Sequence, residues 1–371
     1  MARVTIPLFD PRGLVEEMRP ELDDRMREVV DSGQFILAGH VQAFERAFAD
    51  FLGVRHVVTV ANGTDALTIA LQALGVGPGD DVVVPSFTFF ASAEAVAVLG
   101  ATPVFCDVDE ESLVVTAETV EAALTGNTRV VMPVHLFGMP APMEELTVLA
   151  RNKGFSLLED AAQSAGANLN GRRTGSLAHA ATFSFFPTKN LFCLGDGGAI
   201  ATNDDNVRER ADLLRKHGSP DGKKTFREVG YNSRLDELQA AVLSVGLTRL
   251  DDWTERRRAF AALYDELGIR DLVSPQAGPP GAESAHHMYV VRSPERDRLL
   301  QRLTGAGIGA RPAYHHAVHE QEAMRPYAAG VDLPATRRVV DTALALPMAP
   351  TRTQDDARAV VEALRQALNC G

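Results

Sequence analysis

The sequence predicts an α/β protein with a mostly parallel central sheet and a smaller C-terminal α+β domain. Short apolar runs that suit strands alternate with amphipathic segments that suit helices between residues 57 and 159. The strand runs are apolar throughout, which is typical of parallel strands covered on both faces. With 371 residues, 45% of them hydrophobic and 23% charged, the chain is long enough and ordinary enough in composition for two globular domains.

The predicted elements follow from apolar spacing. Two helices are expected before the alternation, over residues 13–32 and 40–52. The alternation itself predicts strands over 57–61, 81–85, 102–107, 129–135 and 155–159, and helices over 64–73, 92–99, 116–124 and 143–153. A strand over 199–202, a helix over 206–215 and a long helix that opens within 230–239 and runs to about residue 267 are expected next.

The C-terminal third predicts a separate body. A strand over 287–292 and helices over 295–306 and 353–368 follow a Gly/Pro/Ala-rich stretch. We therefore expect a large domain over residues 1–250 and a small α+β domain over residues 251–371. Ligands of parallel sheets bind beyond the carboxyl ends of the strands, so the residues just after each strand are the candidates for function.

Charge and composition exclude several classes of function. A net charge of −12 opposes binding to nucleic acid or to anionic membranes, because the summed field repels phosphate. No segment approaches the roughly 18 consecutive apolar residues of a membrane span. The three cysteines form neither a disulfide framework nor a zinc site. We expect a cytoplasmic protein with neither nucleic-acid nor membrane partners.

Lys189 is the candidate for covalent chemistry. It lies in an aromatic stretch, Phe183–Phe192, where desolvation would disfavour the ammonium and leave a nucleophilic amine, as a Schiff-base lysine requires. The remaining basic residues are arginines, which cannot form an imine, and four lysines that we expect to be solvated: Lys153, Lys216, Lys223 and Lys224. The alternative is a lysine whose stem covers apolar surface while its ammonium reaches water.

Side chains at the strand ends complete a cofactor pocket. Asp160 ends a buried strand, where a carboxylate requires a cationic partner such as a protonated pyridine nitrogen. Gly63 and Thr64 open a helix whose N–H groups could hold a phosphate, although simple N-capping is the alternative. The aromatic run 86–90 offers a stacking face or ordinary core packing. Together with Lys189 these features predict a pyridoxal-phosphate site with no metal.

Seven motifs in order carry a resemblance to a known family. They are Asn62–Leu67 (NGTDAL), Pro85–Phe89 (PSFTF), Pro133–Gly138 (PVHLFG), Glu159–Gln163 (EDAAQ), Phe183–Asn190 (FSFFPTKN), Gly195–Gly198 (GDGG) and Gly230–Glu237 (GYNSRLDE). Over about residues 5–350 the chain resembles the DegT/DnrJ/EryC1/StrS nucleotide-sugar aminotransferases. The resemblance implies the type I fold of pyridoxal-phosphate-dependent transferases, as in aspartate aminotransferase, and a homodimer.

The resemblance also implies roles around the cofactor ring. Lys189 would form the imine with the cofactor, and Asp160 would pair with the ring nitrogen. Gln163 would lie against the ring face or its phenolic side, and Phe89 would stack on the ring.

At the phosphate, the resemblance implies contacts from two subunits. Gly63, Thr64 and Ser184 would come from one subunit and Asn232 from its neighbour, so the homodimer would share its active sites. The alternative is that Asn232 only caps the long helix expected to begin there.

Substrate contacts are implied for Arg234, Tyr314 and His319. The segment 311–321 departs from the family's Tyr-Pro-x-Pro-Leu-His-x-Gln pattern, because the prolines are missing and His315-His316 is added. These histidines lack the H-E-x-x-H arrangement of a zinc site, and the chemistry needs no metal.

The implied activity is amino transfer. An amino acid, expected to be L-glutamate, would donate its amino group to the keto group of a nucleotide-linked sugar, expected to be a dTDP-linked keto-6-deoxy sugar of amino-sugar or antibiotic biosynthesis. A cyclitol ketone as acceptor and a non-catalytic sensor that keeps the pocket are the alternatives. A sugar dehydratase of the family would carry histidine in place of Lys189.

Overall fold

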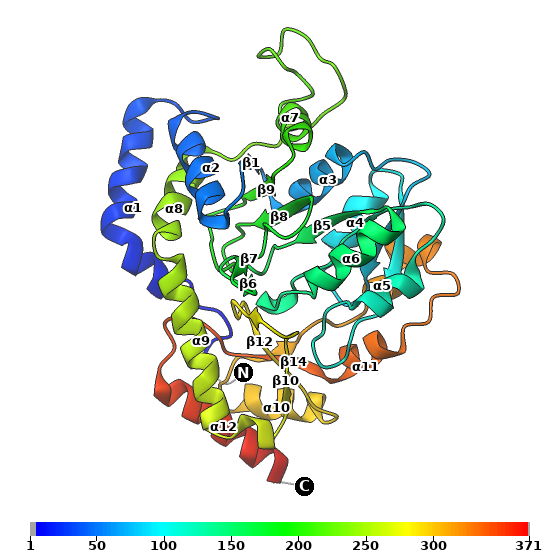
Figure 1. The fold of residues 1–371 in the computed structure, drawn as a ribbon. Coiled ribbons are helices and arrows are strands. Elements are labelled where there is room, and N and C mark those ends of the chain that lie inside the picture. Colours follow the sequence, from blue (N-terminus) through cyan, green and yellow to red (C-terminus); the bar gives the residue numbers. More distant parts are fainter. Residues whose placement is uncertain (1–4, 370–371) are drawn as a thin grey trace.

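The computed structural model describes residues 5–369 (Figure 1). A seven-stranded sheet in the order β1-β9-β8-β5-β4-β2-β3 forms its centre. Its strands are β1 (His56–Val60), β2 (Asp81–Pro85), β3 (Thr102–Cys106), β4 (Thr128–Val131), β5 (Ser156–Asp160), β8 (Ala180–Ser184) and β9 (Gly198–Thr202). β9 is antiparallel to both of its neighbours, and the other six strands are parallel to one another. The predicted mostly parallel sheet is confirmed.

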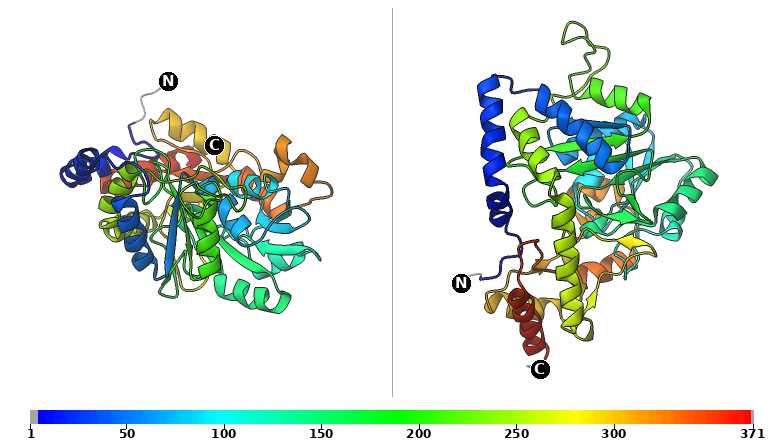
Figure 2. Two further views of the ribbon diagram at one scale, coloured as in Figure 1. Left: turned by 90° about the horizontal axis from the view of Figure 1, so that it is seen from above. Right: turned by 60° about the vertical axis from the view of Figure 1, so that its left-hand side comes forward.

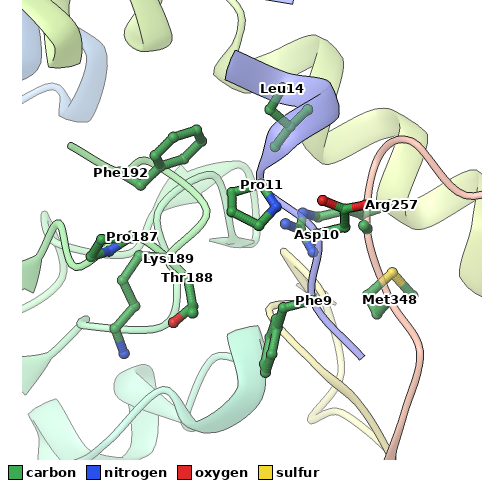
Figure 3. A pocket seen from close by; sticks show the side chains of 11 residues that line it. Phe9, Asp10, Pro11, Leu14, Pro187, Thr188, Lys189, Phe192, Arg257 and Met348 are labelled. Carbon is green, nitrogen blue, oxygen red and sulfur yellow. The ribbon is translucent and has the colours of Figure 1, made fainter. Parts of the chain in front are cut away.

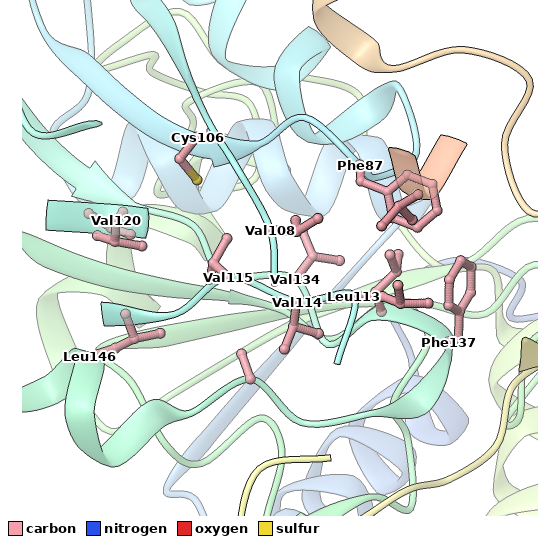
Figure 4. Close-up of a cluster of buried hydrophobic side chains, with 14 of the residues drawn as sticks. Phe87, Cys106, Val108, Leu113, Val114, Val115, Val120, Val134, Phe137 and Leu146 are labelled. Atoms are coloured by element: carbon pink, nitrogen blue, oxygen red, sulfur yellow. The ribbon is translucent and has the colours of Figure 1, made fainter. Parts of the chain in front are cut away.

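Helices cover both faces of this sheet. One face packs against α3 (Gly63–Ala73), α4 (Ala91–Ala97) and α7 (Asp205–Leu214). The other face packs against α2 (Gly39–Leu52), α5 (Ala117–Ala123), α6 (Met143–Lys153) and α8 (Glu237–Leu247). Figure 4 shows part of this second layer, where Val120 of α5 and Leu146 of α6 meet Cys106 of β3. Strands apolar on both faces are therefore buried on both faces.

The N-terminal helix α1 (Arg12–Ser32) lies outside α8 (Figures 1 and 2). Its apolar side chains Leu14, Met18 and Leu22 pack against Val242 and Trp253. Pro20 lies within this helix. The segment ahead of α1 lies against the smaller body, where Ile6 pairs with Ile308.

A second, smaller body contains an antiparallel sheet in the order β10-β12-β14-β13. Its elements are α9 (Leu250–Glu266), β10 (Ser274–Pro275), β12 (Tyr289–Arg292), α10 (Arg296–Gly305), β13 (Arg311–Pro312), β14 (Ala343–Leu346) and α12 (Gln354–Asn369). One side of its sheet packs in a cluster of its own, whereas Val290, Ala343 and Ala345 belong to a cluster that also contains side chains of the large sheet. The division near residue 250 stays a prediction.

Short elements make up the rest of the secondary structure within residues 5–369. They are β6 (Asn168–Leu169), β7 (Arg172–Arg173), β11 (Ala282–Glu283), α11 (Pro334–Thr342) and the 3-10 turns at Leu136–Gly138, Ile269–Asp271, Val318–Glu320 and Glu322–Tyr327. No helix within residues 5–369 is long and apolar enough to span a bilayer.

The expected long helix over about 230–267 is wrong, because the chain forms two helices there. Residues 231–236 are not helical, and α8 begins only at Glu237. Between α8 and α9 the Thr248 hydroxyl donates to the Val245 carbonyl at 2.8 Å, and the Arg249 amide donates to Gly246 at 3.0 Å. A side-chain donor that competes for a backbone carbonyl favours an interruption. β8 was also missed, and the strand expected over 129–135 ends at Val131.

Candidate active site

One cavity of about 780 Å³ lies at the carboxyl ends of β1, β2, β5 and β8. Strands that run parallel bring their ends to one edge, which is why residues far apart in sequence meet here. Eight of the eleven predicted site residues line this cavity: Gly63, Thr64, Phe89, Asp160, Gln163, Ser184, Lys189 and Tyr314.

Lys189 is positioned by the loop after β8. Its amide donates to the Phe186 carbonyl at 2.8 Å, and its side chain extends away from Phe192 and Arg257 (Figure 3). Burial lowers the pKa of Lys189 to about 8, while the charge of Asp160 raises it and that of Arg311 lowers it. The amine is therefore far easier to deprotonate than an ordinary lysine amine, as an imine-forming lysine requires.

Asp160 is the buried carboxyl of the cavity, 5% exposed. Its Oδ2 accepts a hydrogen bond from the Ser92 hydroxyl at 2.9 Å, and its Oδ1 accepts from the Ala162 amide at 3.2 Å. Burial raises the pKa of Asp160, whereas the Ser92 hydrogen bond and the Lys189 charge lower it. Burial has the largest effect on this pKa and disfavours the ionised carboxyl. A cation placed against the carboxyl would stabilise its ionised form.

The N-terminus of α3 faces the same cavity. Asn62 caps the helix, since its side chain accepts from the Asp65 amide at 2.8 Å, and the capping alternative is thus present. The amides of Gly63 and Thr64 belong to the first turn of α3, and the N–H groups of a first turn have no hydrogen-bond partner within the helix. A Cβ built on Gly63 would lie 2.7 Å from the Cβ of Ser184. Only glycine allows this approach, and it places a hydroxyl beside helix N–H groups, a combination that suits phosphate.

Gln163 and Tyr314 form one hydrogen-bonded pair on the cavity wall. Gln163 Oε1 accepts from the Phe137 amide at 2.8 Å, and its Nε2 donates to the Tyr314 hydroxyl at 3.3 Å. Burial raises the pKa of Tyr314, so its phenol is neutral. Phe89 is 61% exposed at this cavity, where its ring is free to stack on a ligand.

Asn232 and Arg234 do not line the cavity of their own chain. Asn232 is exposed and pairs with Lys216 in an isolated bridge. The N-cap of α8 is Asp236, so the alternative that Asn232 caps this helix is wrong. The contact predicted for Asn232 with a neighbouring subunit stays a prediction, as does the substrate contact of Arg234.

His319 lies behind the cavity wall. Its Nδ1 lies 2.6 Å from the Ser86 hydroxyl, and its backbone amide donates to that same hydroxyl at 3.2 Å. Burial lowers the pKa of His319. Its predicted substrate contact stays a prediction.

Ser92 and Arg311 are among the cavity residues that the sequence interpretation missed. Ser92 holds Asp160 and accepts, in turn, a 3.2 Å hydrogen bond from Thr88. Arg311 reaches the cavity from β13. Ser92 lies seven residues after a strand, so its position near a strand end could have marked it as a candidate. Arg311 had no such signal in the sequence, because the pairing of β13 with β14 brings it to the cavity.

Pyridoxal phosphate fits these residues. Asp160 could hold the ring nitrogen, Lys189 could bond to the carbonyl carbon, and the α3 terminus with Ser184 could hold the phosphate. The bound cofactor would supply an electron-accepting ring for chemistry at an amine-bearing carbon. Lys189 could then carry a proton to and from that carbon.

Comparison with known proteins shows the family to which the chain is similar. The family model described as the DegT/DnrJ/EryC1/StrS aminotransferase family matches residues 16–365. The chain is 42% identical over 368 residues to a pleiotropic regulatory protein of Geobacillus stearothermophilus, with 98% of each chain covered. It is 40% identical over 368 residues to a dTDP-3-amino-3,4,6-trideoxy-alpha-D-glucose transaminase of Streptomyces venezuelae, with 97% of this chain and 96% of the relative covered.

A solved structure extends the similarity to three dimensions. The crystal structure of S. venezuelae DesV in complex with a ketimine intermediate matches with a TM-score of 0.94 and 40% identity, over 97% of this chain and 98% of that one. The predicted type I transferase fold is confirmed, and pyridoxal phosphate is the cofactor. The chain belongs to the DegT/DnrJ/EryC1/StrS family and is a pyridoxal-phosphate-dependent aminotransferase.

Proposed function

We propose that this enzyme transfers the amino group of L-glutamate to the keto group of a dTDP-linked keto-6-deoxy sugar in amino-sugar or antibiotic biosynthesis. The observation that carries the proposal is the placement of Lys189 and Asp160 in one cavity of about 780 Å³. This volume is near the upper end of the roughly 300–1,000 Å³ of small-molecule sites, which suits a cofactor together with a large substrate. The named activity of the S. venezuelae relative supports the dTDP-linked class.

Each predicted site residue has a role in this proposal. Lys189 would bond to the cofactor and carry the proton to and from the reacting carbon, and Asp160 would hold the ring nitrogen in its cationic form; the bound cofactor would supply an electron-accepting ring. The residues that bind the rest of the cofactor are Gly63, Thr64, Phe89, Gln163 and Ser184. The substrate contacts are Arg234, Tyr314 and His319.

The large domain, residues 1–250, carries the cofactor, and the small domain, residues 251–371, closes the substrate side. We place the enzyme in the reducing cytoplasm, where the buried thiols of Cys106 and Cys193 would stay free.

Absorbance tests this function. The protein loaded with pyridoxal phosphate should absorb visible light, lose that absorbance with L-glutamate, and regain it with a keto sugar nucleotide. A panel of 3-keto and 4-keto sugars linked to dTDP or UDP would identify the acceptor. Recovery with a cyclitol ketone alone would overturn the sugar assignment. Absorbance that no amino acid removes would favour a sensor, the alternative to which the 42% identical regulatory protein draws attention.

We further propose a homodimer whose active sites are shared. The segment that precedes α8, residues 216–232, projects from the molecule at the top of Figure 1. It carries Phe226 at 59% and Val229 at 90% exposure, apolar surface that a second subunit could cover. Asn232 follows these side chains and is exposed as well. A phosphate dianion held only by the α3 terminus and Ser184 would gain a further donor from a neighbour's Asn232.

Mixed dimers test this sharing. Lys189→Ala and Asn232→Ala proteins, each impaired alone, would be unfolded and refolded together. If the pocket is shared, the mixed dimer contains one site with both changes and one site with neither. The heterodimer fraction should therefore recover toward half of the wild-type activity, measured as amino-sugar formation per heterodimer.

A matched control uses two changes that belong to the same chain's cavity. Lys189→Ala refolded with Asp160→Asn should stay inactive, because every site in that mixed dimer carries one damaged residue. If Lys189→Ala with Asn232→Ala behaves like this control although heterodimers form, Asn232 acts within its own subunit and sharing is wrong.

A further inference from the structure

Residues 231–235, which precede α8, form an extended segment that is fixed to its own chain. Its backbone pairs with that of residues 214–216, to which the Tyr231 amide donates at 2.7 Å and the Ser233 amide at 3.1 Å. Successive side chains of an extended backbone point to opposite sides. Ser233 is fully buried, whereas Asn232 is exposed. The segment therefore presents Ser233 to the interior of its own chain and Asn232 to the surface.

The Ser233 hydroxyl bridges residues 61–65, the α3 turn, which connects β1 to α3. Its Oγ accepts a hydrogen bond from the Ala61 amide at 3.0 Å and donates one to Asp65 Oδ2 at 2.6 Å. Ala61 directly follows β1, and Asp65 belongs to the first turn of α3. A hydrogen bond from a hydroxyl to a carboxylate is short and stronger than one between neutral groups. One buried hydroxyl thus holds both ends of the α3 turn.

The α3 turn carries the backbone amides that suit a phosphate. Asn62 caps α3 by accepting from the Asp65 amide at 2.8 Å. The amides of Gly63 and Thr64 thus remain as the first-turn donors for a ligand. Both residues line the cavity together with Ser184. Because binding groups must be held within about 0.5 Å of their productive positions, these donors depend on what fixes the two ends of the turn.

We propose that Ser233 and Asp65 are positioning residues for the cofactor phosphate, and that their hydrogen bond fixes the α3 turn on the segment 231–235. Neither side chain is required to touch the reacting atoms, since both act through the amides between them. This inference rests on the proposed function, in which those amides and Ser184 hold the phosphate. Asn232 lies on the other side of the same segment. In a dimer that shares its sites, the hydrogen bond would therefore also position the donor offered to the neighbouring phosphate.

Two substitutions at Asp65 separate the hydrogen bond from the charge. Asp65→Asn keeps an oxygen that can accept from Ser233 and removes a charge that would repel a phosphate, whereas Asp65→Ala removes both. The full-length protein, freed of cofactor, would be titrated with pyridoxal phosphate and followed by visible absorbance. Asp65→Asn should bind as tightly as wild type or more tightly. Asp65→Ala should bind about 10-fold more weakly than Asp65→Asn, and Ser233→Ala about 10-fold more weakly than wild type, the effect of one hydrogen bond.

Pyridoxal separates positioning from a purely structural role. It has the ring and aldehyde of the cofactor but no phosphate, so every variant should bind it as tightly as wild type does. Ser233→Ala combined with Asp65→Ala should bind pyridoxal phosphate no more weakly than Ser233→Ala alone, because both changes remove the same hydrogen bond. Thr125→Ala is the matched control. It removes a hydroxyl–carboxylate hydrogen bond of equal length, 2.6 Å to Asp81, at the start of β2 and outside the cavity.

Several results would overturn the proposal. They are an unchanged affinity of Ser233→Ala for pyridoxal phosphate, an equal loss of affinity for pyridoxal, and equal affinities of Asp65→Ala and Asp65→Asn. If Ser233→Ala does not fold, the two Asp65 variants decide the question. Ser184→Ala shows which claim has failed. Wild-type affinity in Ser184→Ala would place the phosphate elsewhere and overturn the proposed cofactor contacts as well, whereas weaker binding in Ser184→Ala but not in Ser233→Ala would overturn the positioning role alone.

Discussion

Lys189→Ala is expected to abolish amino transfer and to leave the fold intact. Among the residues that line the cavity, Lys189 is the lysine, and it is the residue that we propose to bond to the cofactor and to carry the proton. General acid–base catalysis alone contributes about 10²- to 10⁴-fold, so turnover should fall by at least about 10³-fold when the imine is lost too. The folded state lowers the pKa of Lys189 to about 8, below the value of an unfolded lysine. Burying the charged ammonium therefore lowers the free energy of unfolding, in full below pH 8. Removing the side chain should not lower the melting temperature.

Turnover and thermal unfolding would be measured together for this variant. Lys153→Ala is the matched control, since Lys153 forms a surface ion pair with Glu121 at 2.8 Å, away from the cavity. It should keep both activity and stability. Wild-type turnover in Lys189→Ala would show that another group performs the chemistry.

Asp160→Asn is expected to reduce turnover by about 10²- to 10³-fold, the cost of breaking a buried ion pair. Asparagine retains one oxygen, which can still accept from the Ala162 amide, and its NH2 group can donate to the Ser92 hydroxyl in place of accepting from it. The shape of the side chain is therefore kept while the charge is lost. The ring nitrogen would then lose its counter-charge. Steady-state turnover and the dissociation constant of pyridoxal phosphate would both report this loss.

Stability separates this role from a structural one. Burial raises the pKa of Asp160 in the folded, cofactor-free protein, so the unfolded state releases the proton at lower pH. The ionised carboxyl therefore costs stability once the pH exceeds the unfolded pKa near 4. Cofactor-free Asp160→Asn should unfold at the same temperature as wild type or higher, and pyridoxal phosphate should stabilise it less. A less stable cofactor-free variant with normal turnover would contradict this account.

The cavity residues that could be predicted from the sequence lie directly after strands. Asp160 and Gly63 owe their positions to chain direction, since parallel strands deliver their ends to one edge. Ser184 ends a strand that was missed, because Ala180–Ser184 merges into the aromatic stretch around Lys189 and has no turn signal of its own. The motif around Lys189 thus identified Ser184, although the strand that carries Ser184 was not predicted.

Contacts between distant segments could not be predicted. Ser92 and Asp160 are 68 residues apart, and their hydrogen bond depends on how α4 packs beside β5. Arg311 reaches the cavity only through its pairing with β14. Apolar periodicity specifies which face of an element is buried but not which partner covers it.

Transfer of ¹⁵N from L-glutamate to a keto sugar nucleotide would show the proposed amino transfer itself. The cofactor-loaded enzyme would be incubated with ¹⁵N-labelled L-glutamate and a panel of dTDP-linked keto-6-deoxy sugars, and the products would be analysed by mass spectrometry. The account predicts a sugar nucleotide that carries one ¹⁵N amino group in wild type and none in Lys189→Ala. Label that reaches no keto sugar nucleotide in wild type, although glutamate removes the visible absorbance, would contradict the account.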